Sequence, residues 1–110
     1  MGASKSDQFS EHQNKVANTL KAMAHPARIA IIEHLLDQPS CICGDLVSVL
    51  PLSQPTISQH LKELKSVGLI KGSVEGTSVC YCLDEVAFKN IQSYFEGINN
   101  SLKTKSSECC

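Results

Sequence analysis

The sequence predicts a mainly α-helical chain with one small β-hairpin, in the order ααααββα. Two observations predict this class. Apolar residues recur at helical spacing in five segments that are separated by turn residues. Residues 69–74 and 77–83 flank a two-residue Glu75-Gly76 turn, and apolar and polar residues alternate over residues 78–83. The length of 110 residues fits one domain. We expect this domain to span residues 1–103, followed by a tail without periodicity over residues 104–110.

The first helix is predicted from about Asp7 to Ala24, where an apolar stripe includes Phe9, Val16 and Leu20. His25-Pro26 interrupts the pattern, and a proline is well suited to open the next helix. That second helix, with the sequence ARIAIIEHLL, is apolar on most sides. We therefore expect it to be a core helix.

A short helix over residues 44–50 is predicted next, followed by a helix that begins SQPTISQHLKEL at Ser53. A helix, a short turn and a second helix form a helix-turn-helix. Ile57, Leu61 and Leu64 form one stripe of the second helix, and amide and hydroxyl side chains fill the opposite face. Such side chains are weak helix formers, but they can hydrogen-bond base edges and phosphates. We expect the following residues of this helix to contact DNA: Ser53, Gln54, Pro55, Thr56, Ser58, Gln59, His60 and Lys62.

His60 lies at the edge of the buried stripe, so packing or a phosphate contact is expected of it more than base reading. The β-hairpin that follows would be the wing of a winged helix, with Lys71 and Thr77 near the minor groove. Its second strand should bury Val79, Tyr81 and Leu83 and turn its cysteines outward.

The last helix is predicted to begin after Asp84, a good N-cap residue. Its apolar residues are spaced 3-4-3-4, which is a narrow seam of the kind that packs on a partner helix. The residues of this seam are Phe88, Ile91, Phe95, Ile98 and Leu102.

A net charge of −1 predicts that a DNA complex of this chain neutralises few phosphates.

The composition excludes several classes of protein. No run of 18 apolar residues is present, and the first residues lack a secretory signal, so a cytoplasmic protein is expected. We find no Ser-His-Asp pattern, phosphate loop or carboxylate cluster, and therefore expect no enzymatic activity.

Six cysteines occur as three pairs: Cys41/Cys43, Cys80/Cys82 and Cys109/Cys110. In a reducing compartment, thiol chemistry or metal binding is expected of such pairs rather than a structural disulfide framework. If Ser40 caps the first helix of the helix-turn-helix, Cys41 and Cys43 can chelate together, and the helix N-terminus favours their thiolates.

Three stretches resemble the ArsR/SmtB family of winged-helix repressors: KAMAHPARIAIIEHL, GDLVSVLPLSQPTISQHLKELKSVGLI and EGTSVCYCLD. They run from about Lys21 to Asp84. The resemblance implies base reading by Gln54, Pro55, Ser58 and Gln59, and release from a two-fold operator by an inducer. It also implies a homodimer through the first and last helices, with this interface: Phe9, Val16, Leu20, Phe88, Ile91, Phe95, Ile98 and Leu102.

The family resemblance places a soft-metal or arsenite site near Cys41 and Cys43, although this pair lies one residue N-terminal to the usual register. Because trivalent arsenic takes three thiolates, we expect Cys109 or Cys110 of the tail to complete the site. No obligatory cofactor is expected. Cys80 and Cys82 are possible additional thiols or packing residues. Two alternatives stay open: a repressor of the same fold that responds to thiol oxidation or persulfides, and a thiol-rich metal-binding or interaction module without DNA binding.

Overall fold

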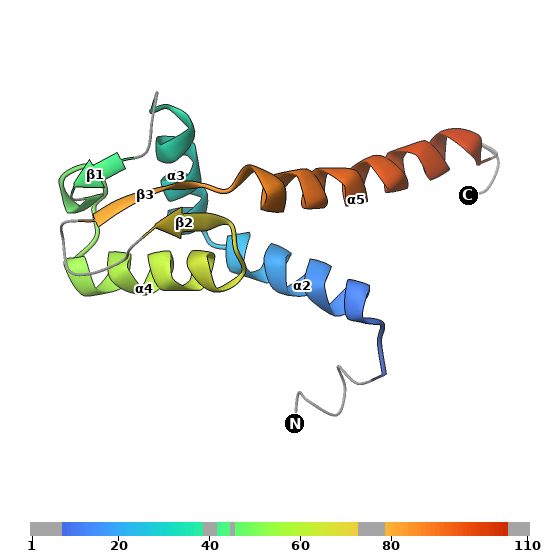
Figure 1. The fold of residues 1–110 in the computed structure, drawn as a ribbon, viewed down its shortest axis with the longest axis horizontal. Coiled ribbons are helices and arrows are strands. Elements are labelled where there is room, and N and C mark those ends of the chain that lie inside the picture. Colours follow the sequence, from blue (N-terminus) through green and yellow to red (C-terminus); the bar gives the residue numbers. More distant parts are fainter. Residues whose placement is uncertain (1–7, 39–41, 45, 73–78, 106–110) are drawn as a thin grey trace.

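A computed structural model of the protein describes residues 8–38, 42–44, 46–72 and 79–105, with backbone only at 42–44, 47 and 79. The chain forms helices around a small antiparallel sheet, which confirms the predicted fold class (Figure 1). The elements in chain order are α2 (Glu11–Met23), α3 (Pro26–Leu36), β1 (Ile42–Gly44), the 3-10 helix η1 (Leu46–Ser48), α4 (Gln54–Ser66), β2 (Ile70–Gly72), β3 (Val79–Leu83) and α5 (Glu85–Thr104).

Capping residues define the helix starts. Ser10 and Gln13 form a reciprocal capping box at the start of α2. His25 caps α3 by accepting the backbone N–H of Ala27 at its Nδ1, and Pro26 follows in the first turn. Asp84 caps α5 by accepting the N–H of Val86, as the sequence predicts.

Helix α4 packs its apolar stripe against α3 and the sheet. Ile57, Leu61 and Leu64 are all buried in the core, as expected from their spacing. Ser53 has the extended backbone of an N-cap residue, but its hydroxyl pairs with the hydroxyl of Thr56 instead of capping the helix. The core also includes Ile31, Ile32, Leu35, Leu46, Leu69, Ile70 and Tyr81.

The sheet contains a strand that the sequence analysis missed. Its order is β1-β3-β2, with β3 antiparallel to both neighbours. The helix predicted over residues 44–50 is reduced to the single 3-10 turn of η1, and Cys43 lies on β1. The expectation that a helix N-terminus surrounds Cys41 and Cys43 is therefore wrong for Cys43. Cys41 lies outside the described residues.

The predicted wing corresponds to β2 and β3, in which Ile70 pairs with Leu83 and Gly72 with Tyr81. Tyr81 is 1% exposed, which confirms the predicted inward face of β3. Gly72 has a φ of 122°, and a Cβ atom there would overlap the carbonyl oxygen of Cys80. Glycine is thus required where the two strands approach each other. The predicted Glu75-Gly76 turn lies outside the described residues.

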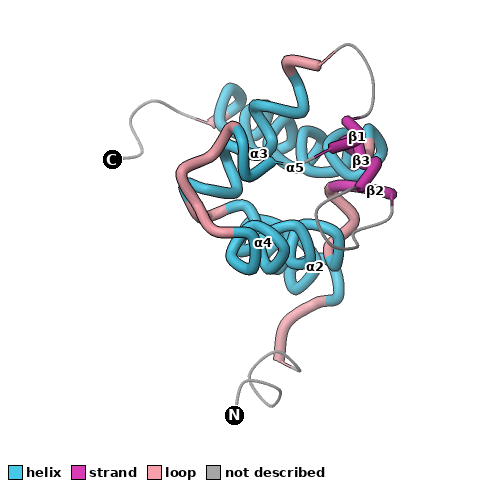
Figure 2. Tube along the Cα trace, turned by 90° about the vertical axis from the view of Figure 1, so that its left-hand side faces the viewer, coloured by secondary structure: helices cyan, strands magenta, loops and turns pink. Residues whose placement is uncertain are grey.

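Helices α2 and α5 extend from the same side of the domain, away from the sheet (Figures 1 and 2). Most of α5 projects beyond the core, and none of its residues is fully buried. Phe95, Ile98 and Leu102 are exposed along it. Within the described part of the chain, no helix is long and apolar enough to cross a membrane.

Candidate nucleic-acid interface and thiol site

The outer face of α4 presents an ordered set of amide and hydroxyl groups. The Nε2 of Gln54 donates to the hydroxyl of Ser58 at 2.8 Å. One turn further, the Nε2 of Gln59 donates to Glu63 at 3.0 Å. These bonds hold the side chains on the helix surface, where Gln59 is exposed and Gln54 and Ser58 are half-buried.

Most of the residues that were predicted to contact DNA lie on this surface. Pro55, Thr56 and Lys62 are exposed on α4, and the N-cap residue Ser53 is exposed directly before it. Lys71 is exposed on β2, the first strand of the wing. Thr77 lies outside the described residues. The exposed polar face and the wing strand thus belong to two elements that both pack on the same core.

His60 differs from the other predicted contacts because it is only 7% exposed and faces the protein. Its Nδ1 accepts a hydrogen bond from the Nε of Arg28 at 3.0 Å. Its ring also lies against the ring of His25, with 4.4 Å between centroids. Burial, and then the neighbouring His25 and Arg28, lower the pKa of His60. The buried imidazole is therefore held neutral, as an acceptor for Arg28.

Arg28 connects three helices, a role that the sequence analysis did not find. Besides His60 on α4, its guanidinium donates through Nη1 to the carbonyl oxygen of Ala22 on α2, at 3.1 Å. Arg28 itself lies on α3. No local pattern indicates this role, because its partner His60 lies 32 positions along the chain.

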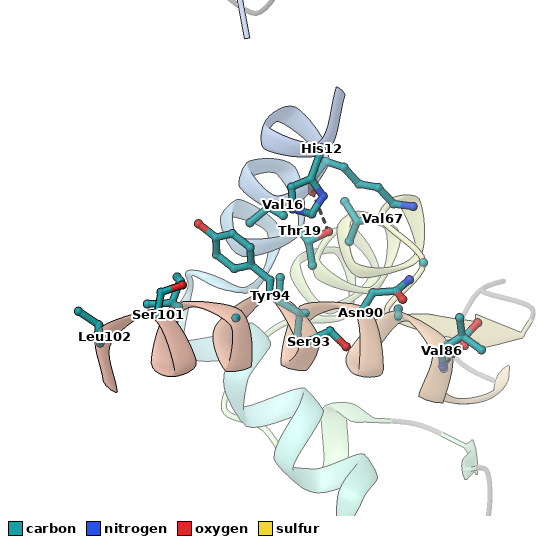
Figure 3. Close-up of a pocket in the computed structure, with 17 residues that line it drawn as sticks. His12, Val16, Thr19, Val67, Val86, Asn90, Ser93, Tyr94, Ser101 and Leu102 are labelled. Atoms are coloured by element: carbon teal, nitrogen blue, oxygen red, sulfur yellow. Dashed lines mark hydrogen bonds between the residues drawn. The ribbon is translucent and has the colours of Figure 1, made fainter. Parts of the chain in front are cut away.

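A cavity of about 1080 Å³ lies between α2 and α5. His12, Val16 and Thr19 of α2 point toward Tyr94 of α5, and Val67 borders the same space (Figure 3). The rings of His12 and Tyr94 are 5.8 Å apart between centroids. The two helices therefore enclose an open, largely apolar space and do not pack tightly on each other.

The residues that were predicted to form the dimer interface lie in different environments. Phe88 packs partly against the core of its own chain, and Leu20 is half-buried. The others line the α2/α5 cavity or are strongly exposed. Those that line the cavity are Val16, Ile91, Ile98 and Leu102, and those exposed elsewhere are Phe9 and Phe95.

The cysteines within the described residues gather on the sheet. The register places Cys43 of β1 directly opposite Cys80 of β3. Cys80 is exposed and Cys82 half-buried, and both are disulfide-bonded. Among the side chains described, no group of three His, Cys, Asp or Glu residues could hold a metal ion. Cys41, Cys109 and Cys110, which were predicted as metal ligands, lie outside the described residues.

Comparison with known proteins identifies the family to which this chain belongs. Residues 25–71 match the model of the bacterial regulatory protein family named arsR. The chain is also 37% identical to the uncharacterized HTH-type transcriptional regulator MJ1325 of Methanocaldococcus jannaschii, over 74% of this chain and 91% of that protein. The chain belongs to the ArsR/SmtB family of winged helix-turn-helix regulators.

Other relatives of this ArsR/SmtB family member are named for metals or for repression. It is 33% identical to a cadmium resistance regulatory protein CadC homolog of Staphylococcus aureus, over 79% of this chain and 72% of that one. It is 44% identical to the transcriptional repressor SmtB of Mycobacterium tuberculosis over 58% of this chain. That match spans only about half of the repressor's length, 47%.

A solved structure supports the fold independently. An ArsR-like transcriptional regulator from Rhodococcus superposes with a TM-score of 0.66, covering 83% of this chain and 85% of the other, at 20% identity. The three relatives compared by sequence are all named as regulators of transcription and not as enzymes. This agrees with the expectation that the protein is not an enzyme.

Proposed function

We propose that this protein is a dimeric repressor that binds operator DNA through α4 and is released by a thiophilic inducer. The observation that carries the DNA-binding part is the exposed amide and hydroxyl face of α4, held in place by a buried apolar stripe. Gln59 and Gln54 are suited to bidentate contacts with adenine, and Ser58 to a base or phosphate. Lys62 and Lys71 would hold the backbone of the duplex.

A matched pair of variants tests base reading by α4. Gln59 and Gln92 each donate to a glutamate four residues further along an exposed helix face, but only Gln59 lies on α4. We expect Gln59→Ala to weaken binding to DNA from upstream of the gene by about tenfold, since a bidentate base contact contributes about 1 to 3 kcal/mol. Gln92→Ala should bind as the wild type does. Equal losses of DNA affinity in both variants would contradict base reading by α4.

We further propose that the two-fold repressor forms through α2 and α5. Exposed apolar side chains on a terminal helix are typical of a surface that a partner covers. The cavity between α2 and α5, together with Phe95 and Leu102 of the unburied α5 seam, offers such a surface for a second copy. Sedimentation equilibrium should give twice the chain mass at micromolar concentration.

The proposed inducer is arsenite or another soft metal ion. Its ligands would be Cys41 and Cys43, with Cys109 or Cys110 as a third thiolate. The cadmium resistance named for one relative is consistent with a soft-ion inducer. The three pairs of cysteines supply the thiolate chemistry that such ions prefer.

Titration of the reduced protein on its upstream DNA tests the inducer. We expect arsenite to release the DNA, and Cys41→Ser with Cys43→Ser to abolish that release. Release by peroxide but not by arsenite would favour the redox-responsive alternative, which the disulfide-bonded Cys80 and Cys82 support. If no sequence-selective DNA binding is found at low salt, the remaining alternative is the thiol-rich module without DNA binding.

A further inference from the structure

We infer that Cys43 and Cys80 form a reversible cross-strand disulfide, and that this pair is the site at which an oxidant of the peroxide class modifies the protein. The main evidence is the register of the sheet, which places these two residues directly opposite each other. Directly opposed residues on antiparallel strands have Cα atoms about 4.5 or 5.5 Å apart, and disulfides usually span about 4.4 to 6.8 Å.

The second observation is that Cys80 and Cys82 are both disulfide-bonded in the structure. A bond to Cys82 is disfavoured, because β3 is a regular strand in which residues two positions apart are separated by about 7 Å. A bond from Cys43 to Cys82 would run along the diagonal of the ladder, where the separation is also about 7 to 8 Å. Cys43 is therefore the cysteine on β1 that the register assigns to Cys80.

The face of the sheet suits this chemistry. Tyr81, between Cys80 and Cys82, is buried in the core, so the two cysteines lie on the opposite face of β3. Cys80 is exposed there, where a small oxidant can reach it. On β1, Cys43 is the residue that the backbone register sets opposite Cys80.

The reaction balances with one peroxide for each disulfide. The thiolate of Cys80 attacks one oxygen of hydrogen peroxide, the O–O bond breaks, and the departing hydroxide takes up a proton to give water. The resulting sulfenic acid is attacked by the thiolate of Cys43. The S–S bond forms, the S–O bond breaks, and the leaving hydroxide becomes a second water by taking the Cys43 proton. The two sulfurs together lose two electrons, and the peroxide gains them.

The bond would tie the strand before the helix-turn-helix to the wing. Strand β1 has three residues, lies at an edge of the sheet, and ends shortly before η1. A ladder of this length is weak by itself. The disulfide would therefore decide whether β1 stays paired with β3. Under the proposed function, on which this consequence rests, oxidation should change operator affinity by about fivefold or more.

Two matched variants test the pairing, both with Cys109→Ser and Cys110→Ser. The facing variant carries Cys41→Ser and Cys82→Ser and keeps Cys43 with Cys80. The diagonal variant carries Cys41→Ser and Cys80→Ser and keeps Cys43 with Cys82. After full reduction and one equivalent of hydrogen peroxide, trypsin digestion without reductant separates the β1 peptide, 29–62, from the β3 peptide, 72–89.

We expect the facing variant to give the 29–62/72–89 cross-link within one chain, and the diagonal variant to give little of it. Equal yields in both variants, or cross-links only between chains on non-reducing gels, would overturn the pairing. In the wild type, a disulfide looped within peptide 72–89 would also overturn it, in favour of a Cys80–Cys82 bond.

Hydrogen exchange on the wild type provides a measurement that needs no variant. Amides of residues 42–44 should exchange at least about tenfold faster in the reduced than in the oxidised protein, and unchanged exchange would contradict the inference. Operator affinity is measured separately on both states of the facing variant. Equal affinities would overturn the regulatory consequence alone, whereas loss of DNA binding in both states would contradict the proposed function and leave the disulfide intact.

Discussion

The Nε of Arg28 on α3 donates to the Nδ1 of His60 on α4 at 3.0 Å, and this bond fixes the candidate recognition helix to the core helix behind it. The same guanidinium donates to the carbonyl oxygen of Ala22 on α2. His60 must be neutral at Nδ1 to accept, because a protonated imidazole is a donor at both nitrogens. The position of α4 is thereby coupled to a single protonation state.

This bond predicts that the protein loses stability as the pH falls. The pKa of His60 is lowered by burial, His25 and Arg28, so the folded state takes up a proton less readily than the unfolded chain does. The stability that neutral His60 contributes is therefore fully present at pH values above its pKa in the unfolded chain, about 6.5. It is lost as the pH falls from there toward the folded pKa. Urea unfolding at about pH 7.5 and at about pH 5.5 measures the difference.

Two asparagine variants test whether His60 is the source of this pH dependence. His60→Asn keeps an acceptor oxygen for Arg28 but cannot be protonated, so it should lose part of the pH dependence. His34→Asn, on the last turn of α3, should keep the wild-type difference. If both variants retain the full difference, His60 is not its source.

Two glycine substitutions test the geometry of the wing. Gly68 and Gly72 both have positive φ, but only at Gly72 would a Cβ meet another strand. Gly68→Ala should cost about 1 kcal/mol from backbone strain alone. Gly72→Ala should cost at least about 2 kcal/mol, because the backbone of Cys80 and Tyr81 must shift as well. Equal unfolding free energies for the two variants would show that β2 and β3 are not as close as described.

Neighbouring residues of α5 test the proposed dimer. Ile98 borders the α2/α5 cavity, whereas the exposed Asn99 does not. Each substitution to aspartate adds one negative charge, yet only Ile98→Asp places it in the apolar seam. We expect that variant to weaken dimerisation by at least about tenfold and Asn99→Asp to leave it unchanged. Sedimentation equilibrium distinguishes the two variants. If both remain dimeric, this surface is not the dimer interface.

Lysine substitutions test how the DNA backbone is held. The low net charge predicts a shallow dependence of affinity on salt. Lys62→Ala and Lys71→Ala should each reduce the slope of log Kd against log salt by about one, because each removes one cation from a phosphate. Lys89→Ala, exposed on α5, serves as the control. A slope that falls equally in all three would indicate a general charge effect without defined phosphate contacts.

The sequence predicts well those features that local pattern determines. The stripe of Ile57, Leu61 and Leu64, the cap at Asp84 and the helix start at Pro26 all follow from neighbouring residues. Strand β1 could not be predicted in this way. It has three residues, too few to show alternation, and its formation depends on β3, far along the chain.

In the candidate site, too, features set by local pattern could be predicted, and contacts between distant residues could not. The polar face of α4 is apparent from a helical wheel, but the contacts behind it are not. Arg28 and His60 meet only because two helices cross, and no spacing rule connects them. For Cys43 and Cys80, the sequence does contain an indication of the pairing. Two Cys-x-Cys pairs, each able to present both cysteines on one face of a strand, are compatible with two facing strands.

The most direct test of the proposed function is a hydroxyl-radical footprint of the reduced protein on DNA from upstream of its gene, at low salt. Two copies that each insert α4 into the major groove should protect two half-sites about one helical turn, or about 10 base pairs, apart. Gln59→Ala should weaken both protected patches together. Uniform protection along the duplex, or none, would contradict the claim that α4 reads an operator.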